Sequence, residues 1–168
     1  MFELLIKQAR DDFDLTEPSH QQSVTKLADD FIEVGNHEAL SAVLQGAGVP
    51  LEAKMAGLLT KSKSWIRVND KPVKLGIVFA MWGEQNRLKP KSSENPHGEN
   101  SLITKLEQLD WVAHGSSIDW HLYAVDDGCP HGSGEIARQV AKGHPLGDRV
   151  SVLSLADALP AEDGPLKN

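Results

Sequence analysis

Residues 120–137 read WHLYAVDDGCPHGSGEIA, and this stretch decides the fold class. A short strand is expected to end on two carboxylates, a Gly/Pro turn follows, and a helix then begins at a small polar residue. Such a layout places acids and free backbone N–H groups together at the carboxyl end of a strand, where open α/β sheets bind their ligands. The stretch therefore predicts a strand–loop–helix unit with a ligand site in its loop.

The strand–helix pattern continues on both sides of this stretch. Residues 75–81 form a continuous apolar run, which predicts a strand buried on both faces. A polar loop over 83–100 separates that strand from a helix that Ser101 is expected to cap. Ser133 is expected to cap the next helix, and residues 149–155 predict a third strand. The order β-α-β-α-β predicts a parallel sheet with right-handed crossovers.

The N-terminal part has a helical pattern instead. A short helix is expected over residues 2–9, and Ser19 with Gln22 forms a capping box that begins a longer one. That helix should end at Gly35, and Pro50 suits the first turn of a third helix. The apolar stripes expected to form core faces are Val24, Leu27, Ala28, Phe31 and Ile32, then Leu40, Val43 and Leu44, then Leu51, Met55, Leu58 and Leu59.

These patterns divide the chain into three parts. Residues 1–70 form a helical N-terminal region, residues 71–156 form a small α/β domain, and residues 157–168 form a Pro/Gly-containing charged tail. A sheet of three parallel strands leaves exposed edges, which proteins normally cover or extend. The sequence is therefore expected to be the front part of a larger α/β domain.

Composition argues against several functional classes. The chain has 168 residues, of which 40% are hydrophobic, and its formal charge of −7 argues against a general nucleic-acid-binding protein. The single cysteine, Cys129, cannot form an internal disulfide, which favours a reducing compartment. Neither a signal peptide nor an apolar run long enough for a membrane span is found, so we expect a cytoplasmic protein.

Charged and metal-binding residue types give weaker signals. The segment 71–100 carries 5 basic and 3 acidic side chains within an acidic chain, so its basic residues either attract a phosphate or form a solvated loop. The Gly-rich segment 128–134 precedes a helix and is a candidate phosphate contact, although it lacks a P-loop lysine. Its Cys129 should have a lowered pKa beside the helix N-terminus. The histidines are scattered without ligand spacing, so no zinc site is expected.

Two segments resemble a known family. Residues 78–88 read VFAMWGEQNRL, and residues 125–133 read VDDGCPHGS. The first looks like the first strand and the Tyr-Asn-Glu-Glu turn of glycosyltransferase family 2, and the second is similar to that family's Val-Asp-Asp-Gly-Ser-Thr-Asp-Gly-Ser. The resemblance covers residues 73–156 and implies the nucleotide-binding half of a GT-A (Rossmann-like) fold.

The resemblance also implies roles for particular residues. Asp127 would bond the base of a nucleotide-sugar donor, usually uracil, while Asp126 supports it or faces the ribose. Trp82 would line the base pocket and offer an aromatic face for stacking, and Glu84 would bond the ribose or orient the loop. The residues implied to bind the nucleotide are Ala80, Trp82, Glu84, Asp126, Asp127 and Gly128.

Each of these residues also has a purely structural interpretation. The acidic pair at 126–127 suits an Asx-type turn at the strand end, with Gly128 supplying a positive φ. Trp82 suits a packing position at the end of a strand, and Glu84 suits a solvated loop charge. The residues alone leave both interpretations open, and only the resemblance favours the functional one.

The implied activity is that of a hexosyltransferase type of enzyme. It would transfer a sugar from a nucleotide-diphosphate donor to an acceptor hydroxyl, and in the complete enzyme Mg²⁺ or Mn²⁺ would neutralise the leaving diphosphate. The family's Asp-x-Asp metal motif comes after the third strand, where this chain has only Glu162-Asp163 in its tail. We therefore expect neither a metal site nor catalytic residues within this chain, and weak nucleotide binding with little or no turnover.

Two other functions are compatible with the sequence. One is a non-catalytic nucleotide-binding or protein-interaction module, in which residues 1–70 dock a protein partner. The other is a phosphoacceptor receiver domain, although its acidic pair would follow the first strand and not the second. The donor sugar, the acceptor, the stereochemistry and the oligomeric state do not follow from the sequence.

Overall fold

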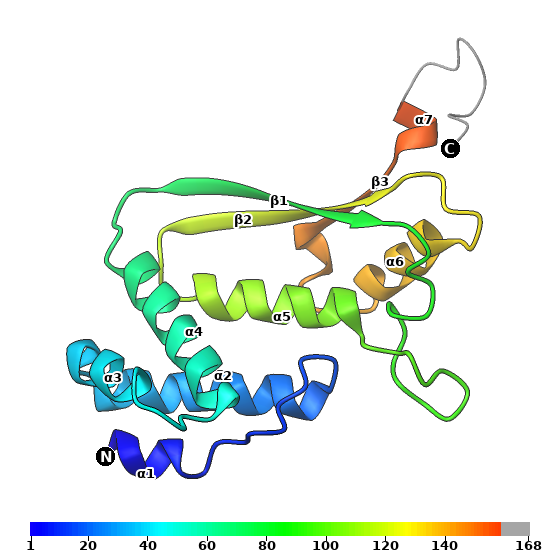
Figure 1. The fold of residues 1–168 in the computed structure, drawn as a ribbon. Coiled ribbons are helices and arrows are strands. Elements are labelled where there is room, and N and C mark those ends of the chain that lie inside the picture. The colour runs from blue at the N-terminus through cyan, green and yellow to red at the C-terminus, as the bar shows by residue number, and fades with distance from the viewer. Residues whose placement is uncertain (159–168) are drawn as a thin grey trace. The chain divides into compact units, whose positions relative to one another are not determined.

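The computed structural model describes residues 1–158, which form a mixed α/β protein with a three-stranded parallel sheet (Figure 1). In chain order the elements are α1 (Phe2–Ile6), α2 (Pro18–Val34), α3 (His37–Leu44), α4 (Leu51–Arg67), β1 (Val73–Met81), α5 (Ser101–Ala113), β2 (Ile118–Asp126), α6 (Ser133–Lys142), the 3-10 turn η1 (Gly147–Arg149), β3 (Val150–Ser154) and α7 (Leu155–Ala158). Apart from its first two residues, which lie in α7, the predicted tail 157–168 with Glu162 and Asp163 falls outside the described residues.

The chain divides into two compact units. The helical unit comprises residues 1–71 with 112–117, and the sheet unit comprises residues 72–111 with the described residues from 118 onward. No helix within residues 1–158 is both long and apolar enough to cross a membrane.

Helix α2 supplies the main apolar face of the helical unit. It begins at Pro18, with Glu17 as the residue before it, so the predicted capping box at Ser19 is wrong. The cause is the proline, whose fixed φ suits the first helical position and sets the start two residues earlier. The helix ends at Gly35, as predicted, with a φ of 68°. The buried residues of the predicted stripe are Val24, Leu27, Ala28 and Phe31.

Helix α4 packs on α2 through small residues. Ala53 and Ala56 are buried on one face of α4. The hydroxyl of Thr60, also buried, donates across the contact to the carbonyl oxygen of Ala28 at 3.1 Å. Small side chains let two helix backbones approach closely, so these residues select the face of α4 that enters the core.

This packing contradicts the core face predicted for α4. The predicted stripe included Leu51 and Leu58, which are 49% and 61% exposed. Met55 and Leu59 are only half-buried. Both faces of α4 carry residues that could be buried. The face with small residues is the one that packs against α2, because small side chains let the two helices approach closely. A stripe of large apolar side chains on α4 is left uncovered within the helical unit.

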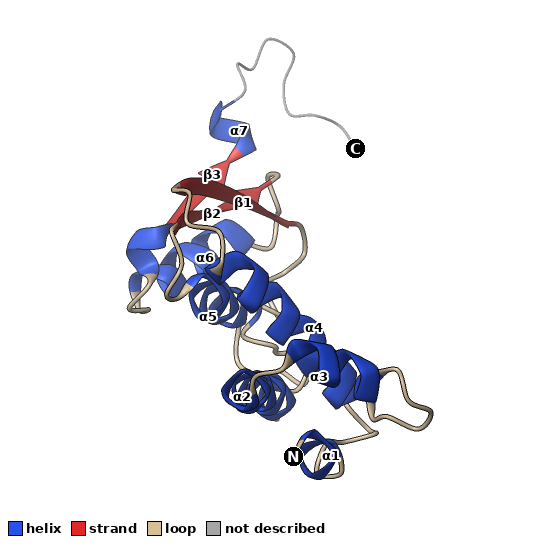
Figure 2. Ribbon diagram, turned by 90° about the vertical axis from the view of Figure 1, so that its left-hand side faces the viewer, coloured by secondary structure: helices blue, strands red, loops and turns tan. Residues whose placement is uncertain are grey.

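The sheet unit is built on three parallel strands in the order β1-β2-β3. The register aligns Ile77 of β1, Leu122 of β2 and Val150 of β3. Helices α5 and α6 lie on the same side of this sheet, as the two ribbon views show (Figures 1 and 2). The β2 side chains that face the helices, Trp120, Leu122 and Ala124, are all buried.

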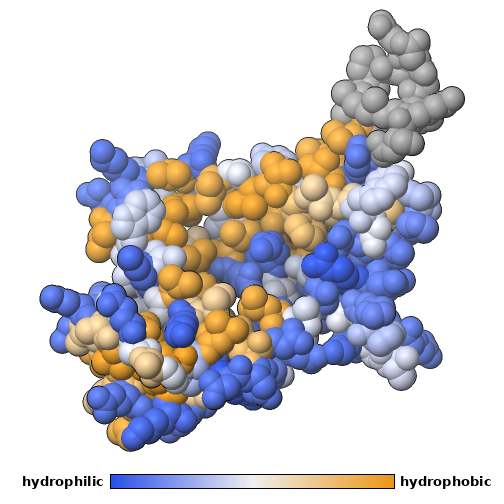
Figure 3. Space-filling model, viewed as in Figure 1, coloured by the Kyte–Doolittle hydropathy of each residue, from blue (hydrophilic) through white to orange (hydrophobic). Residues whose placement is uncertain are grey.

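No helix of residues 1–158 covers the opposite face of the sheet. Val78 of β1 pairs with Tyr123 of β2, and the two side chains are 71% and 37% exposed. Figure 3 shows apolar residues gathered along the sheet. The prediction that β1 is buried on both faces is therefore wrong, because this strand is an edge and helices cover only one of its faces.

Two predicted helix caps are also wrong. Ser101 and Ser133 are the first residues of α5 and α6, and each follows a residue with positive φ, Asn100 at 48° and Gly132 at 73°. The Ser101 hydroxyl is buried and has no hydrogen-bond partner among the described residues. Ser133 uses its hydroxyl for a contact to the β1 loop, which positions the candidate site.

Candidate functional site at the carboxyl ends of β1 and β2

The ends of β1 and β2 lie side by side. Met81 pairs with Asp126, so the loops that follow both strands leave the sheet at the same edge. Two hydrogen bonds then join these loops. The N–H of Gly83 donates to Sγ of Cys129 at 3.3 Å, and the N–H of Glu84 donates to Oγ of Ser133 at 3.1 Å. The two segments that carry the family resemblance thus form one structure.

Asp126 fixes the loop between β2 and α6. Its Oδ1 accepts a hydrogen bond from the N–H of Cys129 at 2.9 Å, and its Oδ2 accepts one from the N–H of Gly134 at 3.1 Å. Both donors are backbone groups of buried residues. A carboxylate here also complements the positive end of the α6 dipole. Asp126 therefore occupies the place at the start of α6 where a phosphate would otherwise be expected.

Asp127 differs from its neighbour. Its side chain is exposed and forms no hydrogen bond or ion pair with another residue of the described chain. Gly128 follows with a φ of 76°, in the left-handed region that glycine adopts without strain. The turn thus leaves Asp127 with a solvated carboxylate, able to accept hydrogen bonds from a ligand.

The predicted residues of β1 lie beside this turn. Ala80 is exposed on the uncovered sheet face, and Trp82 is 54% exposed just after the strand. An exposed indole at a strand end offers a flat apolar surface to a ligand. The structure therefore brings Ala80, Trp82, Asp127 and Gly128 to one edge of the sheet, and their role in binding stays a prediction.

Glu84 is engaged within its own loop. Its Oε2 lies 3.0 Å from Nη1 of Arg87, whose Nε donates to Glu99 at 3.0 Å. The hydrogen bond to Glu99 raises the pKa of Arg87, and the nearby Glu84 charge acts in the same direction. Arg87 is thus held by two carboxylates, so the site has no free guanidinium at this position for a phosphate.

Cys129 is a buried thiol with an unusual set of neighbours. Its side chain is 7% exposed, and its Sγ lies 3.2 Å from Oγ of Ser133. Burial raises the pKa of this thiol, but hydrogen bonds from Ser133 Oγ and from the backbone N–H groups of Gly83, His131 and Ser133 outweigh it, and the pKa falls below its ordinary value. The Cys129 sulfur is therefore a structural acceptor that links the two loops.

We predict that Ser133→Ala raises the pKa of Cys129, because it removes a hydrogen bond that stabilises the thiolate. The measurement is the pH dependence of alkylation by iodoacetamide, whose midpoint should move to higher pH. Ser151→Ala serves as the control, since it removes a hydroxyl that bonds His121 instead. An unchanged midpoint in Ser133→Ala would show that the hydroxyl does not donate to the sulfur.

Sequence reasoning missed the residues that assemble this site. Ser133 was expected to cap a helix, and the contact of Gly134 with Asp126 was not expected. Neither contact has a local sequence signal, because each joins residues that are distant along the chain or separated by a turn. A hollow of about 450 Å³ in the sheet unit lies among residues such as Lys74, Trp120 and Arg149, and none of the predicted nucleotide-binding residues lines it.

Neither the grouping of possible metal ligands nor a comparison with known proteins assigns a role to this site. Among residues 1–158, no three His, Cys, Asp or Glu side chains are grouped so that they could hold a metal ion. We assign no described residue to a metal. No family model, no curated protein and no solved structure matches the chain.

Proposed function

We propose that the sheet unit is the nucleotide-binding part of a GT-A domain, and that the activity is that of a family 2-like glycosyltransferase. Such an enzyme transfers a sugar from a nucleotide-diphosphate donor to an acceptor hydroxyl. The parallel sheet, the adjoining ends of β1 and β2 and the resemblance of residues 78–88 and 125–133 support this proposal.

The observation that carries the proposal is the difference between two adjacent carboxylates. Asp126 is bound to two backbone N–H groups, whereas Asp127 has no protein partner among the described residues. A solvated carboxylate at a strand end is suited to accept an N–H from a nucleobase, and uracil offers such a group at N3. Trp82, exposed on the neighbouring loop, supplies an aromatic surface on which any base can stack.

The residues of the chain account for recognition and not for chemistry. Asp127 would select the base by hydrogen bonding, and Trp82 would exclude water from one side of it. No described residue is assigned as a general base or as a ligand of the diphosphate's metal. Sugar transfer by this chain without an added divalent metal would contradict the expectation of little or no turnover.

We predict that UDP binds weakly to the 168-residue chain and that Asp127→Ala weakens this binding about tenfold or more. The reason is the loss of a charged acceptor for the base N–H. The measurement is an NMR titration with ¹⁵N-labelled protein, in which the largest shifts should fall on residues 80–84 and 126–128. ADP should bind less tightly than UDP, since adenine has no matching N3–H donor.

Asp148→Ala provides the matched control for this titration. Asp148 is an exposed aspartate of the same unit, in the turn η1 before β3, and its removal changes the net charge by the same amount. It should leave UDP affinity unchanged. Equal affinity of Asp127→Ala and the unmodified chain would reject the role of Asp127, and an absence of any UDP shift would reject the proposed function.

A further inference from the structure

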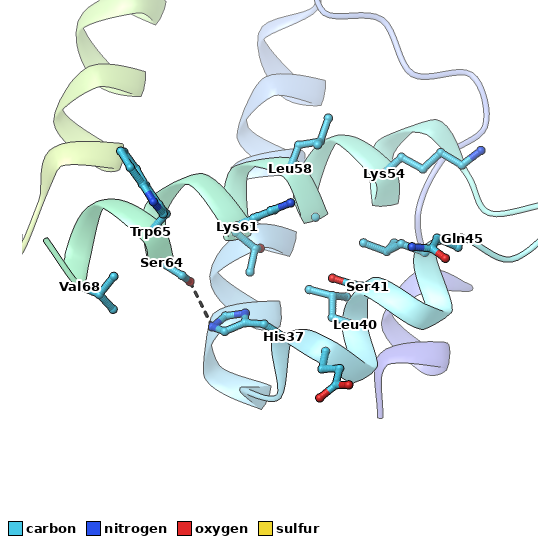
Figure 4. Close-up of a pocket in the computed structure, with 14 residues that line it drawn as sticks. His37, Leu40, Ser41, Gln45, Lys54, Leu58, Lys61, Ser64, Trp65 and Val68 are labelled. Atoms are coloured by element: carbon cyan, nitrogen blue, oxygen red, sulfur yellow. Dashed lines mark hydrogen bonds between the residues drawn. The ribbon is translucent and has the colours of Figure 1, made fainter.

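The helical unit has a groove that the proposed function does not use. It lies between α3 and α4, has a volume of about 700 Å³, and is lined by side chains of both helices (Figure 4). Its floor forms where α3 crosses α4 closely, with Leu44 against Gly57. A hydrogen bond of 3.2 Å between Ser64 and His37 joins the two helices at one end of the groove. Contacts between α3 and α4 therefore define the shape of the groove.

The wall contributed by α4 has a seven-residue repeat. One row consists of Leu58 and Trp65, which line the groove and are 61% and 71% exposed, and Leu51, which is 49% exposed, continues this row outside the groove lining. Between them lies a second row of Lys54, Lys61 and Val68. Rows that repeat every seven residues are the pattern with which one helix packs along another. From Lys54 to Val68 the wall extends about 21 Å, which suits several turns of a partner helix better than a small molecule.

The charges of the groove favour an acidic partner. Lys54 and Lys61 are exposed, line the groove and form no ion pair within residues 1–158. They lie on a helix with four basic side chains and one acidic one, in a chain whose formal charge is −7. A partner that covers the apolar row must place groups beside both lysines, and carboxylates complement the charges of these lysines.

We propose that this groove binds one amphipathic α-helix of another protein, which lays apolar side chains along Leu58 and Trp65 and directs carboxylates to Lys54 and Lys61. The mode is helix-in-groove recognition. It is independent of nucleotide binding, because every residue that lines the groove belongs to the helical unit.

Two other occupants fit the groove less well. In a pair of identical chains, Lys54 and Lys61 of one copy would face the same lysines of the other in either orientation, which is unfavourable. An anionic membrane would attract the lysines, but its surface is broad and cannot enter a groove with a second wall. Glu38 on the α3 wall opposes the negative charges of an acidic helix and of a membrane alike, and Lys54 and Lys61 outnumber it.

The test uses designed helical peptides of about three heptads that carry leucine in one row and glutamate in the next. A fluorescent label on the peptide reports binding to the full chain by anisotropy. At low salt the glutamate peptide should bind about tenfold more tightly than the same peptide with glutamine in that row. The difference should shrink at high salt, because exposed ion pairs are screened.

Charge reversal provides the decisive variants. The double variant Lys54→Glu/Lys61→Glu should bind a lysine-containing version of the peptide in preference to the glutamate one. The matched control, Lys7→Glu/Lys71→Glu, changes the net charge equally at exposed sites outside the groove and should keep the original preference.

Trp65→Ala should weaken the binding of both the glutamate and the glutamine peptide about tenfold, since buried aromatic anchors dominate such contacts. Circular dichroism checks that each variant is folded.

Several results would overturn the proposal. Equal binding of glutamate and glutamine peptides, or an unchanged preference in Lys54→Glu/Lys61→Glu, would remove the charge argument. Self-association that Trp65→Ala abolishes would identify a second copy as the occupant. Binding to phosphatidylcholine vesicles with about one-third phosphatidylserine, with no binding of the glutamate peptide, would identify a membrane instead.

Discussion

Replacing Asp126 by alanine should lower the free energy of unfolding of the sheet unit by about 3 kcal/mol. The carboxylate accepts hydrogen bonds from the N–H groups of Cys129 and Gly134 at 2.9 and 3.1 Å. Hydrogen bonds to a charged acceptor are worth about 1.5–3 kcal/mol each, and both N–H groups belong to buried residues that would be left without a partner. The loss also removes a negative charge from the start of α6, where it is favourable.

Hydrogen exchange of the β2 amides measures this effect, because it reports on the sheet unit separately from the helical unit. Asp127→Ala is the matched control, since it removes the same group from the adjacent residue, and it should change stability by less than about 0.5 kcal/mol. If the two variants lose equal stability, the proposed difference between the two carboxylates is incorrect.

Gly134→Ala should destabilise the sheet unit by about 2 kcal/mol, although alanine is the better helix former. A Cβ at position 134 would lie 2.4 Å from Oδ2 and 3.0 Å from Cβ of Asp126. The carboxylate cannot move away without giving up its hydrogen bonds, so the added methyl group either strains the loop or breaks them. The same exchange measurement on β2 applies.

The double variant Asp126→Ala/Gly134→Ala tests the origin of this cost. With the carboxylate gone, the methyl group has room, and alanine should recover part of its intrinsic helical advantage of about 1 kcal/mol. The double variant should therefore be no less stable than Asp126→Ala alone. A double variant that loses the sum of the two single effects would show that the methyl group strains something other than Asp126.

The order of elements could be predicted because local signals mark them. Gly35 ends α2 with a positive φ, and the apolar runs before Trp82 and Asp127 become neighbouring parallel strands. Since parallel strands end at the same edge, the two motif segments had to meet there. The place of the candidate site thus follows from the sequence as soon as both strands are recognised.

The roles of individual side chains did not follow in the same way. Ser19, Ser101 and Ser133 all have the composition of helix caps, but tertiary contacts and a preceding proline or left-handed residue decide where each helix begins. On α4 both faces could be buried, and only the fit of Ala53 and Ala56 against α2 decides between them. Hydrophobicity alone cannot make that choice.

The different environments of Asp126 and Asp127 also could not be predicted from the local sequence. Asp126 and Asp127 are identical in type and adjacent in sequence, and nothing local distinguishes them. The backbone path after β2 does so, because it turns the N–H groups of Cys129 and Gly134 toward one carboxylate only. The structural role of Asp126 therefore follows from the backbone path of the loop and not from the local sequence.

The internal hydrogen bonds of the loop after β2 determine how freely position 127 can vary in evolution and engineering. Because Asp126, Cys129 and Ser133 hold the loop from within, the residue at position 127 contributes nothing to its shape. Under the proposed function, single-codon changes at 127 would alter what the strand end recognises while the protein continues to fold. Selection would then act on ligand preference at this one position, free of the trade-off with stability that restricts most changes at binding sites.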